Sequence, residues 1–441
     1  MLILVQHKYD SLFVKLRGAG VSKAHTKQAP LQPKKTYTAA GQQQLEDVHC
    51  WTKTSHLVFH SEAMTSLRDK LYRLFRINVH NDTNSWKGID KDVQSLFLPL
   101  NVTQILVLNP VYRLKSNHIQ PNNCICKFVL VLSLVLCLSI FTRRFISILF
   151  DDNLKHLVMS KFLYATPYYD FIFYSSGMVI NFFMFYTQTN NMVTFVLIFQ
   201  DVHRYIYDKS VFRRNIIKIW IYASSTFVFY FITLVVIPII CHKQIFINLD
   251  ISLMLYIVLD VNIVHASVLI KLLTEKVKLW TLEVQKFDQN FDHHVLFQVY
   301  VNILTCYNIF KNVFEKMVLF KTIETFLRFL VNVQKNNPHI SILLYLWSIK
   351  VVAVNMIISL QLEAFYISME QGCYSCEVLL KHSCSGNKNH KKFCKNVLRL
   401  YRAPFTKMTA CGLFSMDVCQ ILRVATLTAH YTVVLLQFAF L

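Results

Sequence analysis

The chain has 441 residues, of which 54% are hydrophobic and 16% charged, and its mean hydropathy is +0.37. Soluble domains carry about 25% charged residues, so this chain has too little polar surface for an ordinary soluble protein. The formal net charge is +21, but Lys and Arg lie mostly between apolar blocks and form no basic stripe interleaved with stacking aromatic residues. Nucleic acid is therefore not an expected partner.

The first part of the chain is polar and basic, and it contains no apolar block long enough to cross a bilayer. Residues 1–92 are predicted to form a cytoplasmic N-terminal arm that is partly disordered. Within the arm, apolar residues recur at helical spacing between basic residues over positions 64–77. This pattern fits either a basic amphipathic helix on the inner leaflet or an ordinary solvated helix.

Residues 93–441 contain seven apolar blocks, and a membrane-spanning helix needs about 20 such residues. The sequence therefore predicts an all-α, polytopic membrane protein with seven transmembrane helices. A helical cytosolic stretch is expected over 271–316, and a long loop with the sequence KNHKKFCK is expected before the last block, whose helix spans about 413–441. The predicted spans are 125–141 with an extension toward 150, 168–188 with an extension through 200, 216–240, 247–270, 317–333, 340–365 and the block 410–441.

The distribution of Lys and Arg predicts the orientation of the chain in the membrane. The N-terminal arm and the loop after the sixth span are richest in these residues, whereas the turns after the third and fifth spans are very short. The loop after the first span is an exception, because it keeps Arg143, Arg144, Lys155 and Lys161. On balance the N-terminus is expected in the cytosol. An odd number of spans then places the C-terminus outside, the reverse of a G-protein-coupled receptor.

Five charged side chains lie inside predicted spans, where an unpaired charge is costly. Three of them recur on one face of the fifth span, so they can pair with one another. One hypothesis is that the five line a ligand cavity or its gating network; the favoured one is that they pair structurally within the bundle. They are Asp260 in the fourth span, Lys321, Glu324 and Arg328 in the fifth, and Lys350 in the sixth.

The end of the chain reads TACGLFSMDVCQILRVATLTAHYTVVLLQFAFL. It resembles the closing pattern of the insect gustatory receptor family: Ala-x-Gly-Leu-Phe-x-hydrophobic-Asp, then Thr-Tyr, five mostly hydrophobic residues and Gln-Phe. His430 stands where the family has Thr. The matching residues are Ala410, Gly412, Leu413, Phe414 and Asp417 in the first part, and Tyr431, Gln437 and Phe438 in the second.

The resemblance implies a taste receptor in the plasma membrane of a chemosensory neuron. Such a receptor is a tastant-gated, non-selective cation channel, assembled as a homo- or hetero-tetramer with other gustatory receptors. The last helix would line the pore, with Tyr431, Gln437 and Phe438 at the pore or gate. Taken alone, the sequence also allows Gln437 to make a single interhelical hydrogen bond. In the sugar-receptor branch a Glu follows the Tyr; Thr432 stands there instead, which favours bitter or other non-sugar ligands.

The resemblance also implies a ligand pocket in the outer half of spans two to six. The expected partners are a small-molecule tastant, membrane lipid and the permeating cations. Apolar walls with a few polar anchors suit a small organic tastant. Aromatic and amide groups at the ends of these spans are candidates to bind it: Tyr168, Tyr169, Asn332, Tyr345 and Trp347.

Other classes of function have less support in the sequence. There is no nucleophile elbow, P-loop or His-Glu-x-x-His motif, so no enzyme, cofactor or metal site is expected. An insect odorant receptor is a related alternative, although the Tyr-x5-Gln-Phe ending argues against it. A G-protein-coupled receptor or a transporter is an alternative from a different class; transporters usually show repeated halves, and the sequence shows none.

Overall fold

The computed structural model describes residues 87–115, 117–150, 165–233, 255–286, 292–333, 338–382, 388–403 and 405–440. They belong to the larger of two compact units of the chain, Arg76–Leu441. Of the predicted arm, only the last six residues are described, and the periodic pattern at 64–77 lies outside the described residues. The end of the third predicted span and the start of the fourth lie outside them as well.

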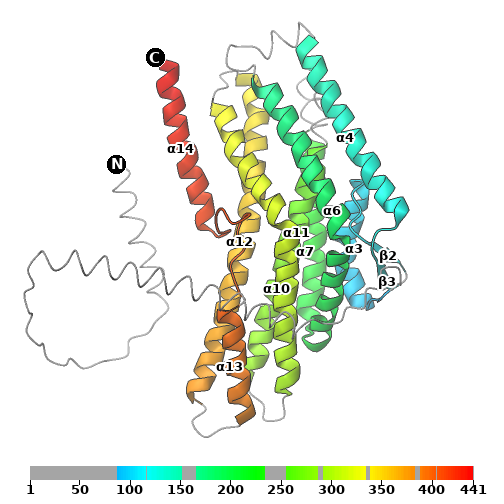
Figure 1. The fold of residues 1–441 in the computed structure, drawn as a ribbon, viewed down its shortest axis with the longest axis vertical. Helices are drawn as coiled ribbons and strands as arrows, with labels where there is room; N and C mark the ends of the chain where they lie inside the picture. Colours follow the sequence, from blue (N-terminus) through cyan, green and yellow to red (C-terminus); the bar gives the residue numbers. More distant parts are fainter. Residues whose placement is uncertain are drawn as a thin grey trace, which may run out of the picture. The chain divides into compact units, whose positions relative to one another are not determined.

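Seven helices of the described unit follow the predicted spans in order and lie side by side in a bundle (Figure 1). Three of them have 41 or 45 residues, about twice the length that a bilayer core requires, so each extends beyond any membrane that it crosses. The predicted all-α architecture is confirmed. The helices are α4 (Cys124–Phe150), α6 (Ala165–Tyr205), α7 (Lys209–Phe231), α10 (Tyr256–Lys286), α11 (His293–Val333), α12 (Pro338–His382) and α14 (Cys419–Phe440).

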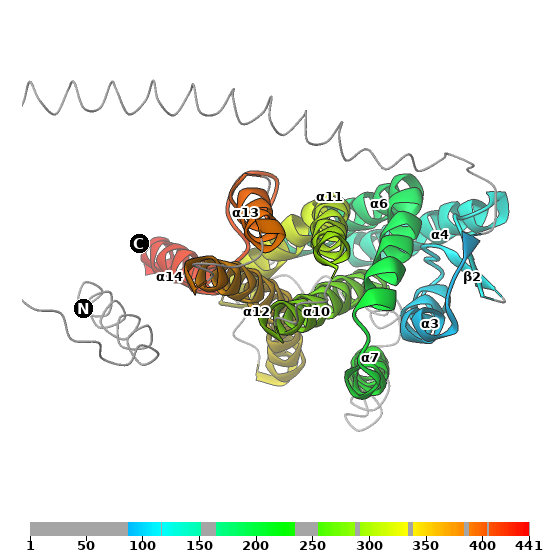
Figure 2. The same cartoon turned by 90° about the horizontal axis from the view of Figure 1, so that it is seen from below.

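Helix α10 forms the centre of the bundle, with α6, α7, α11 and α12 packed against it (Figure 2). Within the apolar windows of these helices, 83% of α10 is buried but only 17% of α4. A helix that is apolar on all sides and buried belongs to the core, whereas an apolar helix with an exposed face needs lipid or a partner. Of the described helices, α4, α10 and α12 contain segments that are long and apolar enough to cross a membrane.

Helix α3 (Lys91–Leu106) packs beside α7 and α10, in a part of the chain for which the sequence predicted no helix. Its polar residue Gln104 is buried, and its amide nitrogen lies 2.7 Å from Asn262 Oδ1 and 3.1 Å from His265 Nδ1 on α10. These bonds satisfy polar groups that would otherwise be costly to bury. A small antiparallel sheet precedes and follows α3, in the order β1 (Lys87–Gly88), β3 (His118–Gln120) and β2 (Arg113–Lys115).

The loop predicted between the last two spans is largely a helix, α13 (Lys388–Arg402). Its lysines and arginines lie on one side, and Phe393, Val397 and Leu398 are buried on the other. This is the pattern of an amphipathic surface helix, and α13 packs against α11 and α12 at the end of the bundle where α12 ends (lower end in Figure 1). The prediction of a loop was wrong because the many basic residues of this segment were taken to indicate an irregular, solvent-exposed conformation.

Candidate ligand pocket, ionic network and last helix

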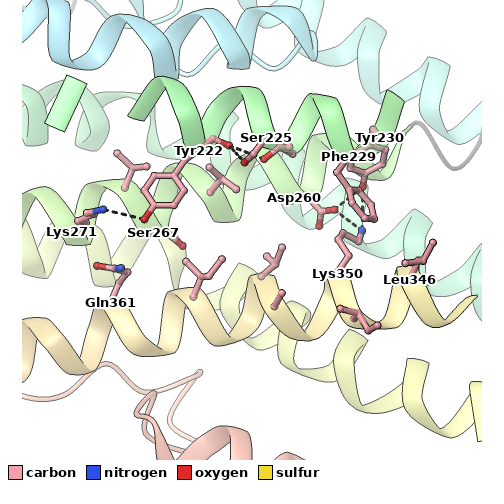
Figure 3. A pocket seen from close by; sticks show the side chains of 17 residues that line it. Tyr222, Ser225, Phe229, Tyr230, Asp260, Ser267, Lys271, Leu346, Lys350 and Gln361 are labelled. Atoms are coloured by element: carbon pink, nitrogen blue, oxygen red, sulfur yellow. Dashed lines mark hydrogen bonds and ion pairs between the residues drawn. The ribbon is translucent and has the colours of Figure 1, made fainter. Parts of the chain in front are cut away.

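A pocket with a volume of about 330 Å³ lies on α10 between α7 and α12 (Figure 3). Ligand pockets range from about 300 to 1,000 Å³, so this one suits a small organic molecule. Its middle is lined by aliphatic side chains such as Val264, Val268 and Val354. Polar side chains gather at its two ends: Tyr230, Asp260 and Lys350 at one, and Tyr222, Lys271 and Gln361 at the other.

The pocket reaches the surface of the bundle. Among its lining residues, Ile349 and Ile357 of α12 are 64% and 38% exposed, and both are apolar. Large exposed aliphatic residues in a helix bundle of this length mark a face that lipid or a partner covers. A ligand in the pocket therefore contacts both the protein core and this face.

The end of the pocket with Asp260 and Lys350 is called its upper end, and the end with Lys271 its lower end. Asp260 is the centre of the ion pairs at the upper end. Its carboxylate accepts hydrogen bonds from Lys350 Nζ at 2.6 Å, Lys321 Nζ at 2.7 Å and Tyr230 Oη at 2.6 Å. All four side chains are buried, and they come from α7, α10, α11 and α12. Three of the five charged residues singled out in the sequence thus meet at one carboxylate.

The ionic network extends away from the pocket into the α4–α6–α11 side of the bundle. Lys321 also pairs with Glu324 at 2.7 Å, and Glu324 accepts a hydrogen bond from Tyr174 at 3.1 Å. Farther along α11, Arg328 lies 3.6 Å from a carboxylate oxygen of Asp170 on α6. The predicted pairing of the fifth span with itself is therefore only part of the arrangement, because its charges also pair across helices.

Arg144 is the residue of α4 that belongs to the ionic network. Its guanidinium lies 3.7 Å from Asp170 and donates a hydrogen bond to Tyr256 Oη at 3.3 Å. The sequence placed this residue in the loop after the first span, but only 14% of its side chain is exposed, because Asp170 provides a partner inside the bundle. Ion pairs of this kind add little net stability compared with apolar packing, but removing one partner costs about 3–5 kcal/mol, because it leaves a buried charge unpaired.

The predicted ligand-binding residues fall in different places. Trp347 is buried beside the network, with its ring 3.8 Å from Lys350 Nζ and in edge contact with Tyr230. Tyr168 is 46% exposed and packs on Phe145, so it does not line the pocket. The hydroxyl of Tyr169 is buried and, among the described residues, has no hydrogen-bond partner. The structure describes the backbone of Asn332 and Tyr345 but not their side chains.

The first half of the C-terminal motif forms a tight turn before α14. Ala410 N donates to Phe414 O at 2.8 Å, and Leu413 N donates to Ala410 O at 3.0 Å. The two central residues, Cys411 and Gly412, have φ of 50° and 76°. A two-residue turn with two positive φ angles favours Gly, which explains why the motif requires one here.

Asp417 then caps the last helix. Its Oδ1 accepts a hydrogen bond from the backbone N–H of Gln420 at 3.0 Å, the geometry of an N-cap residue. Helix α14 begins at Cys419, six residues later than the predicted start near 413, because the intervening residues form the turn and the cap. The Asp of the motif thus has a structural role that its position in the pattern did not reveal.

Helix α14 contacts α11 and α12 and leaves much of its surface exposed in the single chain (Figure 1). Tyr431 is half-exposed and packs edge-on against Phe326, and Gln437 is exposed near the end of the helix. The structure describes the backbone of Phe438 but not its side chain. A second pocket of about 470 Å³ separates the middle of α14 from α12, with Asn355 and Thr428 among its lining residues.

The comparisons with known proteins find similarity to solved structures and not to sequences. No family model matches the sequence, and no curated protein matches it significantly. The structure superposes on that of the insect olfactory receptor OR5 from Machilis hrabei with a TM-score of 0.62 and 12% sequence identity, covering 79% of this chain and 100% of that chain. The chain has the fold of an insect olfactory receptor.

This olfactory-receptor fold confirms the polytopic, all-α membrane architecture and, at the level of fold, the resemblance to insect chemoreceptors. Sequence reasoning found the five charged residues of the network because charges are rare in apolar blocks. It missed Asp170 and the tyrosines Tyr174, Tyr230 and Tyr256, since polar residues at the ends of spans look solvent-exposed and tyrosines look like ordinary core residues. The signal that could have found them is the need of Arg328 and Lys350 for partners.

Proposed function

We propose that the chain is a chemosensory receptor, in which a small organic ligand opens a non-selective cation channel in the plasma membrane. The observation that carries this proposal is the likeness of fold over the whole length of an insect olfactory receptor. The gustatory-type ending, from Ala410 to Phe438, favours a taste receptor, and Thr432 favours non-sugar ligands. An olfactory receptor is the second candidate, because a solved structure with this fold is one.

The pocket between α7, α10 and α12 is the proposed tastant site. Its aliphatic middle would take an apolar body, and its polar ends would orient the ligand. Lys350 lines its upper end and contacts the ring of Trp347 behind it, so the charge network would sense whether the pocket is filled. A few polar groups in an apolar site give specificity, because a ligand that leaves one of them without a hydrogen-bond partner binds at a cost in free energy.

Helix α14 is the proposed pore-lining element, in a tetramer of this chain alone or with related subunits. In a single chain it exposes Leu422, Leu427 and Val433 to 54%, 47% and 55%, and apolar surface of this extent calls for a partner. Four such helices around an axis would cover it and would bring the Gln437 amides together. Amide dipoles next to an apolar constriction suit the passage of a cation.

Helix α12 provides a direct path from the ligand to the pore. Lys350 and Val354 line the ligand pocket, whereas Val352, Asn355 and Met356 line the groove against α14. Because the two sets alternate along the same two turns of one helix, a rotation or shift of α12 changes both sites. A ligand that fits one position of α12 better shifts the population toward that state.

The proposal is tested by whole-cell recording during application of tastant and odorant panels. Gln437→Ala is expected to change the reversal potential or the block of the ligand-gated current, because the amide would contact permeating ions. Gln371→Ala is the matched control. It also removes an exposed amide, but one on the C-terminal part of α12, away from the proposed pore helix α14. Equal permeation in wild type and Gln437→Ala would contradict the pore assignment. A response to volatile odorants alone would favour the olfactory alternative.

A further inference from the structure

Lys271 is a cation that faces the ligand pocket without a carboxylate partner. Its Nζ donates a hydrogen bond to Tyr222 Oη at 3.1 Å and lies 4.6 Å from the centre of the same ring. Among the described residues it makes no ion pair; the nearby Glu275 pairs with Lys278 instead. The one carboxylate among the described lining residues, Asp260, lies at the far end of the pocket, where Lys321 and Lys350 bind it (Figure 3).

The charges of the pocket are therefore divided unequally between its ends. The upper end contains a carboxylate that is saturated with donors. The lower end contains the ammonium group of Lys271, and the polar lining residues labelled near it, Tyr222, Ser267 and Gln361, are all uncharged (Figure 3). Between them lie aliphatic side chains from α10 and α12, including Val264, Val268 and Val354. A ligand that complements this pocket has an anionic head group, which binds at the lower end, and an aliphatic tail, which packs against the aliphatic side chains.

The position of Lys271 along α10 fits the same ligand. It lies fifteen residues after Tyr256, which is about 22 Å along a helix, and a bilayer core is about 30 Å thick. The ammonium group is thus near the lower boundary of a membrane into which the upper part of α10 is inserted. An amphiphile with its head at this level and its tail toward Asp260 has the orientation of a lipid in the lower leaflet.

We propose that this pocket binds carboxylic acids with an aliphatic chain, such as fatty acids, with the carboxylate on Lys271 and the chain along α10 toward Lys350. This inference rests on the proposed function, since it names the ligand class of the same pocket. An ammonium–carboxylate contact in a poorly hydrated site is stronger than a neutral hydrogen bond, so the acid is preferred over the alcohol of the same length. Tyr222 holds the ammonium group in place.

The test is direct binding of radiolabelled decanoate to the purified full-length protein, with decanol and decylamine as competitors. Decanoate is expected to bind, and decanol to compete about tenfold more weakly. Lys271→Gln is expected to weaken decanoate binding about tenfold, and Lys271→Arg to retain it. The control Lys286→Gln removes an exposed lysine at the end of the same helix, away from the pocket, and is expected to change nothing.

Several outcomes would overturn the proposal: equal binding of acid and alcohol, unchanged decanoate binding in Lys271→Gln, or loss of binding in Lys271→Arg with the protein still folded. Competition by phosphatidylglycerol but not by phosphatidylcholine would support a ligand with an acidic head and identify that ligand as a membrane lipid. If neither lipid competes with decanoate, the ligand is the free acid. Binding is read without currents. A protein that binds decanoate but passes no current thus contradicts the channel function and leaves this inference standing.

Discussion

His203 shows how a single residue is held neutral near the lower end of α6, beyond the predicted span. It is 5% exposed and packs against the rings of Tyr207 and Phe212, and among the described residues neither ring nitrogen has a hydrogen-bond partner. Burial lowers the pKa of His203 to about 4, and the positive charge of Lys276 adds to the effect. A protonated imidazole would have to be desolvated beside a cation.

This lowered pKa predicts a loss of stability in acid. The ordinary pKa is 6.5, so the unfolded chain takes up the proton first as the pH falls, and stability is lost between about pH 6.5 and pH 4. At pH 5 the loss is about 2 kcal/mol. His203→Phe is expected to unfold at a temperature that changes less between pH 7.5 and pH 5, measured on the purified protein. His294→Phe, at an exposed histidine, is the control. Equal acid sensitivity of wild type and His203→Phe would contradict the prediction.

The ion pairs of the candidate site could be predicted in part from single residues. Asp260, Lys321, Glu324 and Lys350 stand in apolar blocks, and the cost of an unpaired charge requires partners for them. Which partners they take is set by the crossing of α10, α11 and α12, which no local pattern encodes. Lys271 was missed for the opposite reason, because it follows directly after an apolar block and was read as the first residue of a cytosolic stretch.

At the scale of elements, long apolar blocks predicted the helices, because such blocks have few other stable conformations in a membrane. Helix α3 was missed because Pro99 and its buried polar residues hide it, and its burial depends on contacts with α7 and α10. The bounds of α14 depend on the turn at Cys411 and Gly412 and on the Asp417 cap. The apolar pattern continues through this turn, so hydropathy alone could not place it.

The links between helices in the ionic network predict an order of stability for two variants. Among the described residues, Lys321 bridges Asp260 and Glu324, whereas Lys350 forms an ion pair with Asp260 alone. Lys321→Met removes the cation that pairs with Glu324 in this described set and is expected to cost about 3–5 kcal/mol. Lys350→Met leaves Asp260 paired with Lys321 and is expected to cost less.

Surface expression and thermal stability in detergent measure this order, with Lys278→Met as an exposed control. Equal losses from both network variants would count against separate roles for the two lysines. If Lys350→Met keeps normal expression but loses its ligand response, the residue acts in the pocket rather than only in the fold.

At the scale of the whole described unit, basic residues and the chain end lie at opposite ends of the bundle. Helix α13 carries six Lys and Arg residues at the lower end, where α12 ends and α11 begins, and α14 ends at the upper end (Figure 1). Positive charge favours the cytosolic side of a membrane. The proposed orientation is therefore lower end inside and C-terminus outside.

Epitope tags test this orientation. A tag after Leu441 is expected to be stained by antibody on intact cells, and a tag before Met1 only after permeabilisation. Both tags being stained only in permeabilised cells would contradict an odd number of spans. The opposite pattern, with only the N-terminal tag accessible, would reverse the orientation and favour the arrangement of a G-protein-coupled receptor.

The exposed position of Ile349 and Ile357 at the pocket wall has a consequence for measured potency. A compound that reaches the site sideways comes from the hydrocarbon phase, so its occupancy follows the amount dissolved in the bilayer. Among compounds of equal intrinsic fit, those with higher oil–water partition coefficients will act at lower bath concentrations. Added empty vesicles, which sequester such compounds, will shift every dose–response curve to the right by the factor that partitioning sets.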